Sequence, residues 1–299
     1  MVRNVNWTKT DLLRLDAKYA EMGIHMHQRP LRAAMEILGS GFVLGATDDS
    51  EVRRIMNAYT EMIPEVDNNW PGAGIGLCAS IDRVRKITLP VAFGSCSVEA
   101  WQAMNFASRN EWWDWCRQDP DIASRSSFAL ADLYDFALGI NEAEHASPEA
   151  ATLWHMAQSN LQDISNALPA AFHVDSVIQP ICLVAELAMK GTLVWDGVDP
   201  NDFRGPAGHD LKGLAKRLAK ARPHSDDAAV REVLAKLPPY VQSRYSPQGL
   251  TRLDVVRLAM GVQFIAGSML RRITHVDFAA QMDSGEWPAP RRPFFPAQN

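Results

Sequence analysis

Two arginine–histidine pairs in the second half of the chain have the residue types that acid–base chemistry on a phosphodiester requires. Arg271 and His275 stand four positions apart, and Arg204 and His209 enclose four residues in "RGPAGH". Cleavage of RNA without a metal needs a base near the 2′-hydroxyl and a cation for the developing charge, and these side chains can fill those roles. The first pair would share a face on a continuing helix. The second lies among glycine and proline, which indicate a loop.

Each pair also has an interpretation in which it only supports the fold. His209 or Asp210 would cap the helix that follows and satisfy its free N–H groups. Arg271 and His275 would both favour a helix C-terminus through the helix dipole. Arg271 also falls on the apolar face of its helix, in line with Leu253 and Met260. A cation on such a face needs a partner or an anion.

A basic stretch, "GHDLKGLAKRLAKAR", runs from Gly208 to Arg222 in a chain whose net charge is −5. From Arg204 to Arg222 there are six basic side chains and one acidic one. Helical spacing places the lysines on one stripe, opposite leucines; the basic residues of this face are Lys212, Lys216, Arg217 and Lys220. Two interpretations stay open: a solvated helix face, or a surface that attracts RNA or another polyanion with strong salt dependence.

Composition limits the function classes. The 299 residues are 47% hydrophobic and 22% charged, which is typical of a globular protein. Residues 1–145 carry 14 basic and 20 acidic side chains, so an anion contact is expected in the second half. The four cysteines lack a C-x-x-C pair, which argues against a zinc site or a disulfide framework. We expect no metal and no cofactor, no signal peptide, no apolar run near the roughly 20 residues of a membrane span, and a cytoplasmic protein.

The fold class expected from periodicity is mainly α. Residues 146–283 should form an antiparallel up-and-down helical bundle, with Ser147 and Ser225 as caps of two of its helices. Residues 1–145 should form a mainly helical region that begins with a helix capped at Thr10. That region also holds two short apolar runs, "GFVLGA" and "KITLPVAFG", as possible strands. The proline-rich tail, 284–299, should be extended or disordered, unless Phe294 and Phe295 hold it in a groove.

Residues 149–272 contain an ordered set of motifs. A helix of the type "ATLWHMAQSNLQDISNAL" is followed by "AELAMK", in which Glu186 and Lys190 stand four apart, then by "GHDLKGL" and by a Tyr-x-x-x-Arg-Tyr pattern. The residues of this last pattern are Tyr240, Arg244 and Tyr245. The set, which spans about 40% of the chain, resembles the HEPN family (higher eukaryotes and prokaryotes nucleotide-binding). We know no family for residues 1–145.

The resemblance implies an all-helical bundle that forms homodimers. It also implies one of two activities, because HEPN proteins are either metal-independent ribonucleases or non-catalytic partners and binding modules. The nucleases carry an arginine, four to six other residues and a histidine on a helix. "RGPAGH" has this spacing but lies in a loop, and Arg271 with His275 is one residue short. We therefore expect binding linked to nucleic acid or nucleotide, and the resemblance implies a toxin–antitoxin or phage-defence setting.

Two alternatives remain: a ribonuclease that uses one arginine–histidine pair, and an interaction scaffold that only dimerises. Glu186 and Lys190 are by default a modest surface pair. Arg244 and Tyr245 are by default an anchor within the bundle.

Overall fold

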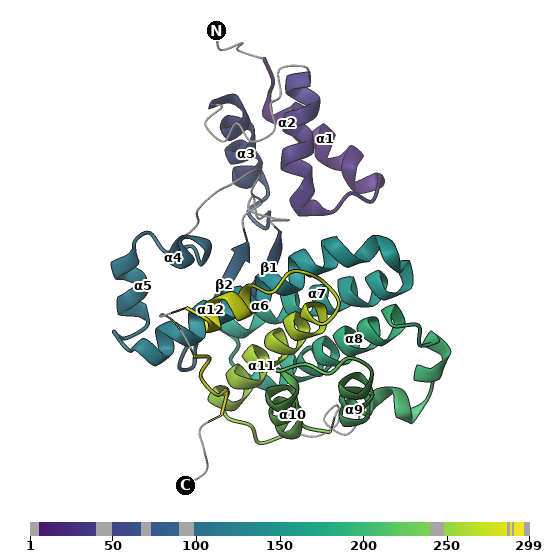
Figure 1. The fold of residues 1–299 in the computed structure, drawn as a ribbon. Coiled ribbons are helices and arrows are strands. Elements are labelled where there is room, and N and C mark those ends of the chain that lie inside the picture. The colour runs from purple at the N-terminus through teal and green to yellow at the C-terminus, as the bar shows by residue number, and fades with distance from the viewer. Residues whose placement is uncertain are drawn as a thin grey trace. The chain divides into compact units, whose positions relative to one another are not determined.

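The computed structural model describes residues 6–39, 50–66, 73–89, 99–239, 248–285, 288 and 290–295 (Figure 1). These residues are mainly helical, as predicted, and the sheet found among them has two antiparallel strands. The chain forms two compact units, residues 1–72 and 73–299. The division thus falls near residue 72 rather than at the boundary expected near residue 145.

The first unit consists of three α-helices around a small core. Its elements are α1 (Lys9–Glu21), a 3₁₀ turn at Met26–Gln28, α2 (Arg29–Leu38) and α3 (Ser50–Met62). Leu12, Ile55 and Tyr59 are fully buried in this core. The cap of α1 is Thr8 and not Thr10, because Asp11 three residues later completes a reciprocal capping box: the Asp11 N–H donates to Thr8 Oγ1, and the Thr8 N–H donates to Asp11 Oδ2.

The second unit contains a β hairpin and the remaining helices. Its elements are β1 (Gly74–Ser80), β2 (Arg83–Leu89), α4 (Ala100–Ala103), α5 (Arg109–Trp115), α6 (Pro120–Ala143), α7 (Pro148–Ala167), α8 (Ile178–Trp195), α9 (Leu211–Ala221), α10 (Asp227–Lys236), α11 (Arg252–Arg271) and α12 (Phe278–Asp283). The strand expected within "KITLPVAFG" is present as the end of β2, whereas "GFVLGA" lies outside the described residues. No strand occurs in the described part of 149–272.

Helix α11 is the centre of the second unit (Figure 1). It packs against α6, α8 and α10, while α7 packs against α8. Nearly every residue from Val255 to Arg271 is buried. Helix α6 is equally buried and shares one hydrophobic core with α7, α8 and α11. This is why the structure does not divide near residue 145: α6 precedes that point in the chain but covers a face of the later helices.

The hairpin is joined to α11 through a single buried amide side chain. Gln263 Oε1 accepts from the Leu77 N–H at 2.9 Å, and Gln263 Nε2 donates to the Leu77 carbonyl at 3.0 Å and to the Ala129 carbonyl at 2.7 Å. Strand β1 pairs with β2 on its other side. The amide therefore satisfies the backbone groups of Leu77 that face the helices, as a neighbouring strand would.

Local signals account for several helix ends. Ser147 caps α7 with Pro148 in the first turn, as expected. Helix α10, in contrast, starts at Asp227 with Asp226 at the cap position, and the predicted cap Ser225 lies one residue earlier. The Asp226 side chain makes no capping hydrogen bond, and its carboxylate binds Arg271 instead.

The described part of the tail packs against the helices rather than standing free. The rings of Phe264 in α11 and Phe294 in the tail are 5.2 Å apart, and the Ser124 hydroxyl donates to the Pro288 carbonyl at 2.9 Å. Arg291 donates to both carboxylate oxygens of Asp132 at 2.8 Å. The tail was expected to be either extended or held in a groove by its two phenylalanines. Residues 290–295 follow the second alternative, because Phe294 packs against Phe264.

By length and composition, two described segments are apolar enough to cross a membrane: Val174–Trp195 and Arg252–Arg271. This corrects the expectation that no apolar run approaches such a length. In each segment 83% of the most apolar window is buried inside the fold. Core helices of soluble proteins are often as long and as apolar, so these two segments are only weak evidence for or against a membrane location.

Candidate functional site

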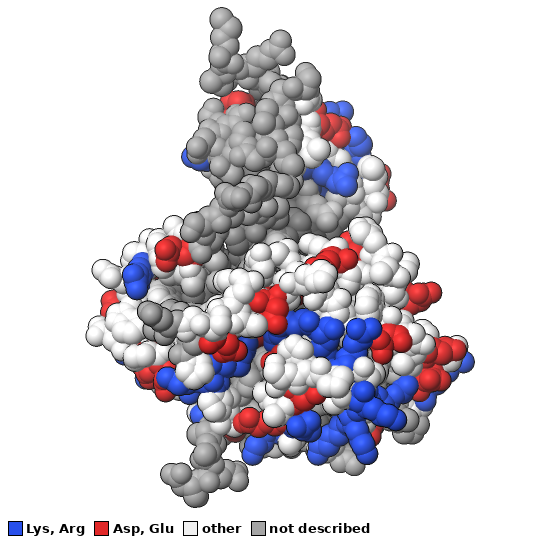
Figure 2. Space-filling model, viewed as in Figure 1, with Lys and Arg blue, Asp and Glu red and all other residues white. Residues whose placement is uncertain are grey.

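The basic face of α9 comprises Lys212, Lys216, Arg217 and Lys220. All four side chains are exposed, whereas Leu214 and Leu218 on the opposite face are buried, as the helical spacing predicts. In the described part of the chain the three lysines have no ion-pair or hydrogen-bond partner. Figure 2 shows lysine and arginine side chains gathered over α9 and α10, with acidic side chains between them. The helix therefore holds a stripe of unneutralised positive charge in water.

Arg217 differs from the lysines because it has partners. Its Nη2 lies 3.7 Å from Asp202 Oδ2, and its guanidinium lies 5.5 Å from the centre of the Phe203 ring. Lys190 Nζ lies 5.6 Å from the centre of the same ring. Phe203 thus lies against one cation from α8 and one from α9, an arrangement that cation–π attraction favours.

The pair Glu186–Lys190 is buried and not on the surface as the default interpretation expected. Lys190 Nζ donates to Glu186 Oε1 at 2.7 Å, and His209 Nδ1 lies 3.1 Å from Glu186 Oε2. The Glu186 side chain is 3% exposed. Two residues of the 3₁₀ turns at 200–209 lie against the pair: Phe203 beside Lys190, and His209 beside Glu186. Two of the motifs that resemble the HEPN family, "AELAMK" and "GHDL", therefore contribute residues that meet beside the start of α9.

The pair Arg204–His209 lies in a loop, as its glycine and proline residues predict. Gly205 has φ of +77°, which favours glycine. Arg204 is exposed and makes no side-chain hydrogen bond or ion pair within the described ranges, whereas His209 faces Glu186. Asp210 occupies the cap position of α9 without a capping hydrogen bond from its side chain.

The pair Arg271–His275 does not share a helix face. Helix α11 ends at Arg271, and His275 is an exposed residue beyond it whose N–H donates to Glu142 Oε1 at 3.0 Å. The predicted shared face required a helix that continued for another turn. The Arg271 side chain is 1% exposed and points into the protein. Arg271 thus faces the interior while His275 lies at the surface, so the shared helix face expected for this pair is absent.

Arg271 is held by three carboxylates. Its Nη1 lies 3.1 Å from Asp132 Oδ1 and 2.9 Å from Asp135 Oδ2, and its Nη2 lies 2.9 Å from Asp226 Oδ2. Arg291 supplies a second cation to Asp132. The cluster thus has three acids and two arginines, so one carboxylate lacks a full counter-charge. The three carboxylates are the partners that a buried arginine on an apolar helix face was expected to need.

The pKa values of two of these acids move in opposite directions. Burial raises the pKa of Asp135 to about 6, against the lowering effect of Arg271 and of hydrogen bonds from the Phe278 and Ala279 N–H groups. Burial also acts on Asp226, but Arg271 and its hydrogen bond outweigh it and lower the pKa of that carboxyl. Of Asp135 and Asp226, Asp135 is therefore the one that takes up a proton first as the pH falls.

We predict a pH-dependent effect of Asp135→Asn. The native state binds this proton more tightly than the unfolded state, so the stabilisation from Asp135 is present below pH 4 and is lost as the pH rises through about 6. Asparagine does not titrate. Relative to the wild type, the free energy of unfolding of the variant should therefore rise by about 2.5 kcal/mol between pH 4 and pH 7. Urea unfolding at both pH values measures this.

Asp163→Asn is the matched control for this experiment. Asp163 is exposed on α7 and has no ion pair or side-chain hydrogen bond in the described structure, so its stability difference from the wild type should stay within about 0.5 kcal/mol at both pH values. A difference for Asp135→Asn that does not change between pH 4 and pH 7 would contradict the prediction.

The predicted anchor residues Tyr240, Arg244 and Tyr245 lie outside the described residues.

The sequence patterns did not predict a concentration of arginines that lines a cavity between α6, α11 and the tail. These residues are Arg125, Arg257, Arg291 and Arg292. The available signal was "PRRPFF", in which two cations precede the aromatic residues of the tail. Within the described ranges, no three His, Cys, Asp or Glu side chains are placed to hold a metal ion.

Comparison with protein-family models, with curated proteins and with solved structures finds no match to this chain.

Proposed function

We propose that this protein binds RNA through the basic face of α9. The proposal is based on three lysines of this face. Lys212, Lys216 and Lys220 are exposed and have no carboxylate partner among the described residues. They recur once per turn, with a rise of about 6 Å between neighbours. Regularly spaced cations of this kind can neutralise successive phosphates and release their counterions.

Two further features support the proposal. Leu214 and Leu218 are buried and hold the helix on the bundle, so the lysines project from a rigid support. The buried pair Glu186–Lys190 is joined to the exposed His209, which ties α8 to the turn that leads into α9. Among polyanions, the resemblance to HEPN proteins favours RNA. A non-catalytic binding role fits better than cleavage, because Arg271 is occupied by carboxylates and His275 lies apart from it.

A homodimer and a setting in toxin–antitoxin systems or phage defence stay predictions that the resemblance implies, and a cytoplasmic location stays a prediction from the composition of the chain. A dimer has a direct test, since light scattering at micromolar concentration would then give a mass near twice the 33.2 kDa of the chain.

We predict that Lys212→Gln, Lys216→Gln and Lys220→Gln together weaken binding of labelled single-stranded RNA roughly tenfold to a hundredfold near 0.1 M salt. The slope of log affinity against log salt should become shallower by about 2, because three phosphate contacts are lost at roughly 0.7 each. Stability should change little, since the stripe is exposed. Titrations at several salt concentrations measure both quantities.

The control removes the same amount of charge elsewhere, by Lys9→Gln, Arg14→Gln and Lys18→Gln on α1. These side chains are exposed and take part in surface ion pairs, which contribute little to stability. If both triple variants lose affinity equally, net charge and not α9 governs binding. If the α9 variant binds as the wild type does, or if neither protein binds RNA, the scaffold hypothesis is favoured.

A further inference from the structure

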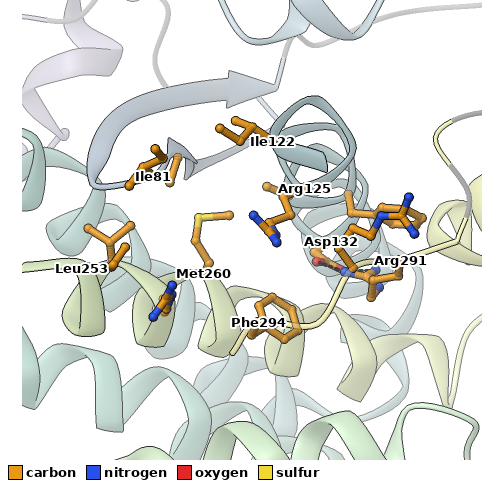
Figure 3. Close-up of a pocket in the computed structure, with 14 residues that line it drawn as sticks. Ile81, Ile122, Arg125, Asp132, Leu253, Met260, Arg291 and Phe294 are labelled. Atoms are coloured by element: carbon orange, nitrogen blue, oxygen red, sulfur yellow. Dashed lines mark hydrogen bonds and ion pairs between the residues drawn. The ribbon is translucent and has the colours of Figure 1, made fainter. Parts of the chain in front are cut away.

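A cavity of about 150 Å³ lies in the second unit where four segments that are distant in sequence meet (Figure 3). Ile81 comes from the turn of the hairpin, Ile122 from α6, Met260 from α11 and Phe294 from the tail. In Figure 3 these labelled side chains surround a common space, with Arg125 directed into it from α6. Most of the other lining residues are apolar.

Four arginines and one aspartate line this cavity, and their pairing is uneven. Arg291 is bound to both oxygens of Asp132, and Arg292 Nε donates to Asp121 Oδ1 at 2.8 Å. Arg125 and Arg257 have no ion pair or side-chain hydrogen bond within the described ranges. The nearest acid to Arg257 along α11 is Asp254, whose carboxylate accepts hydrogen bonds from the Thr251 hydroxyl and N–H. Arg257 acts electrostatically on Asp254 but forms no ion pair with it. The cavity therefore has a lining of apolar and charged residues, in which two arginines have no ion pair among the described residues.

The hairpin turn places an apolar side chain at this cavity through a strained backbone. Ile81 has φ of +60°, a region that β-branched residues rarely adopt, and its side chain remains 44% exposed. Ser80 pairs with Arg83, so Ile81 is the first residue of a two-residue hairpin loop, a position at which the turn itself requires a positive φ. An exposed isoleucine at the edge of a cavity offers apolar area that a bound ring would cover.

We propose that this cavity binds a small aromatic carboxylate. A cavity of about 150 Å³ has room for one benzene-sized ring, which would lie against its apolar residues. Arg125 and Arg257 then bind the carboxylate, for which the planar guanidinium group is well suited. The ring contacts Ile122, Met260 and Phe294. The site is separate from the basic face of α9, so the two proposals succeed or fail independently.

The test is calorimetric titration of the full chain with benzoate and with benzamide, which has nearly the same shape without the charge. Benzoate should bind saturably and at least tenfold more tightly than benzamide. Arg125→Gln with Arg257→Gln should weaken benzoate at least tenfold and remove the preference over benzamide. Arg231→Gln is the control, because Arg231 is exposed on α10, away from the cavity, and has no ion pair in the described structure.

A second variant tests the cavity itself. Met260→Trp fills the space and should abolish binding of both compounds, while circular dichroism shows whether the helical fold is retained. If Met260→Trp loses its helical circular dichroism, the variant with Arg125→Gln and Arg257→Gln still provides the test. Its fold should be retained, because Arg125 is exposed and Arg257 is half-buried. The proposal is overturned if wild-type protein shows no saturable binding of benzoate at tens of millimolar. Equal binding of the two compounds, or undiminished benzoate binding by the double arginine variant, would also overturn it.

Discussion

Replacing Arg271 with methionine will lower the free energy of unfolding by about 3–5 kcal/mol, because it leaves buried carboxylates without their counter-charge. Asp132 and Asp135 are at most 2% exposed, and both lie within 3.1 Å of the lost guanidinium. Asp132 retains Arg291, so the largest loss is expected at Asp135 and Asp226. Urea unfolding at neutral pH, followed by far-ultraviolet circular dichroism, measures the change.

A double variant separates the loss of charge pairing from the loss of packing. Adding Asp135→Asn to Arg271→Met removes one unpaired carboxylate, so the double variant should be more stable than Arg271→Met alone. Arg231→Met is the control and should lie within about 0.5 kcal/mol of the wild type. If Arg271→Met is as stable as the wild type but loses an RNA-cleaving activity, Arg271 is catalytic and the ribonuclease hypothesis is restored.

Gln263→Leu should cost about 2–4 kcal/mol. Leucine has a similar size but cannot replace the two hydrogen bonds with Leu77, so a backbone N–H and a carbonyl lose their partner in the core. Each buried group without a partner costs about 1–3 kcal/mol. Leu77 itself is fully buried, so water cannot easily replace the amide. The midpoint of urea unfolding should fall accordingly.

Hydrogen exchange locates the effect of Gln263→Leu on the hairpin. The amide of Leu77 should lose protection more than amides in the middle of α7, because its acceptor has been removed. Gln281→Leu, at an exposed position of α12, controls for the change in residue type. Unchanged protection of Leu77 would mean that the hairpin is held mainly by apolar packing on α6 and α7.

Local sequence patterns predicted much of the second unit correctly. Ser147 and Pro148 marked the start of α7, and the leucine and lysine spacing predicted which face of α9 is exposed. Both depend on interactions within a few residues, which spacing encodes directly. Even these signals failed where a side chain was needed elsewhere: Asp226, at the cap position of α10, binds Arg271 from α11.

The sequence by itself determined that this is a mainly helical protein with one concentrated basic face. Its motifs pointed to Glu186 with Lys190 and, separately, to His209 with Arg204. Only the tertiary structure decided that Glu186 and Lys190 are buried, and that Arg271 is enclosed by acids from α6 and the start of α10. It also decided that the tail completes a cavity with α6, α11 and the hairpin turn. The physical reason is that burial and charge pairing depend on which distant segments meet, whereas helical periodicity and capping depend on neighbours along the chain.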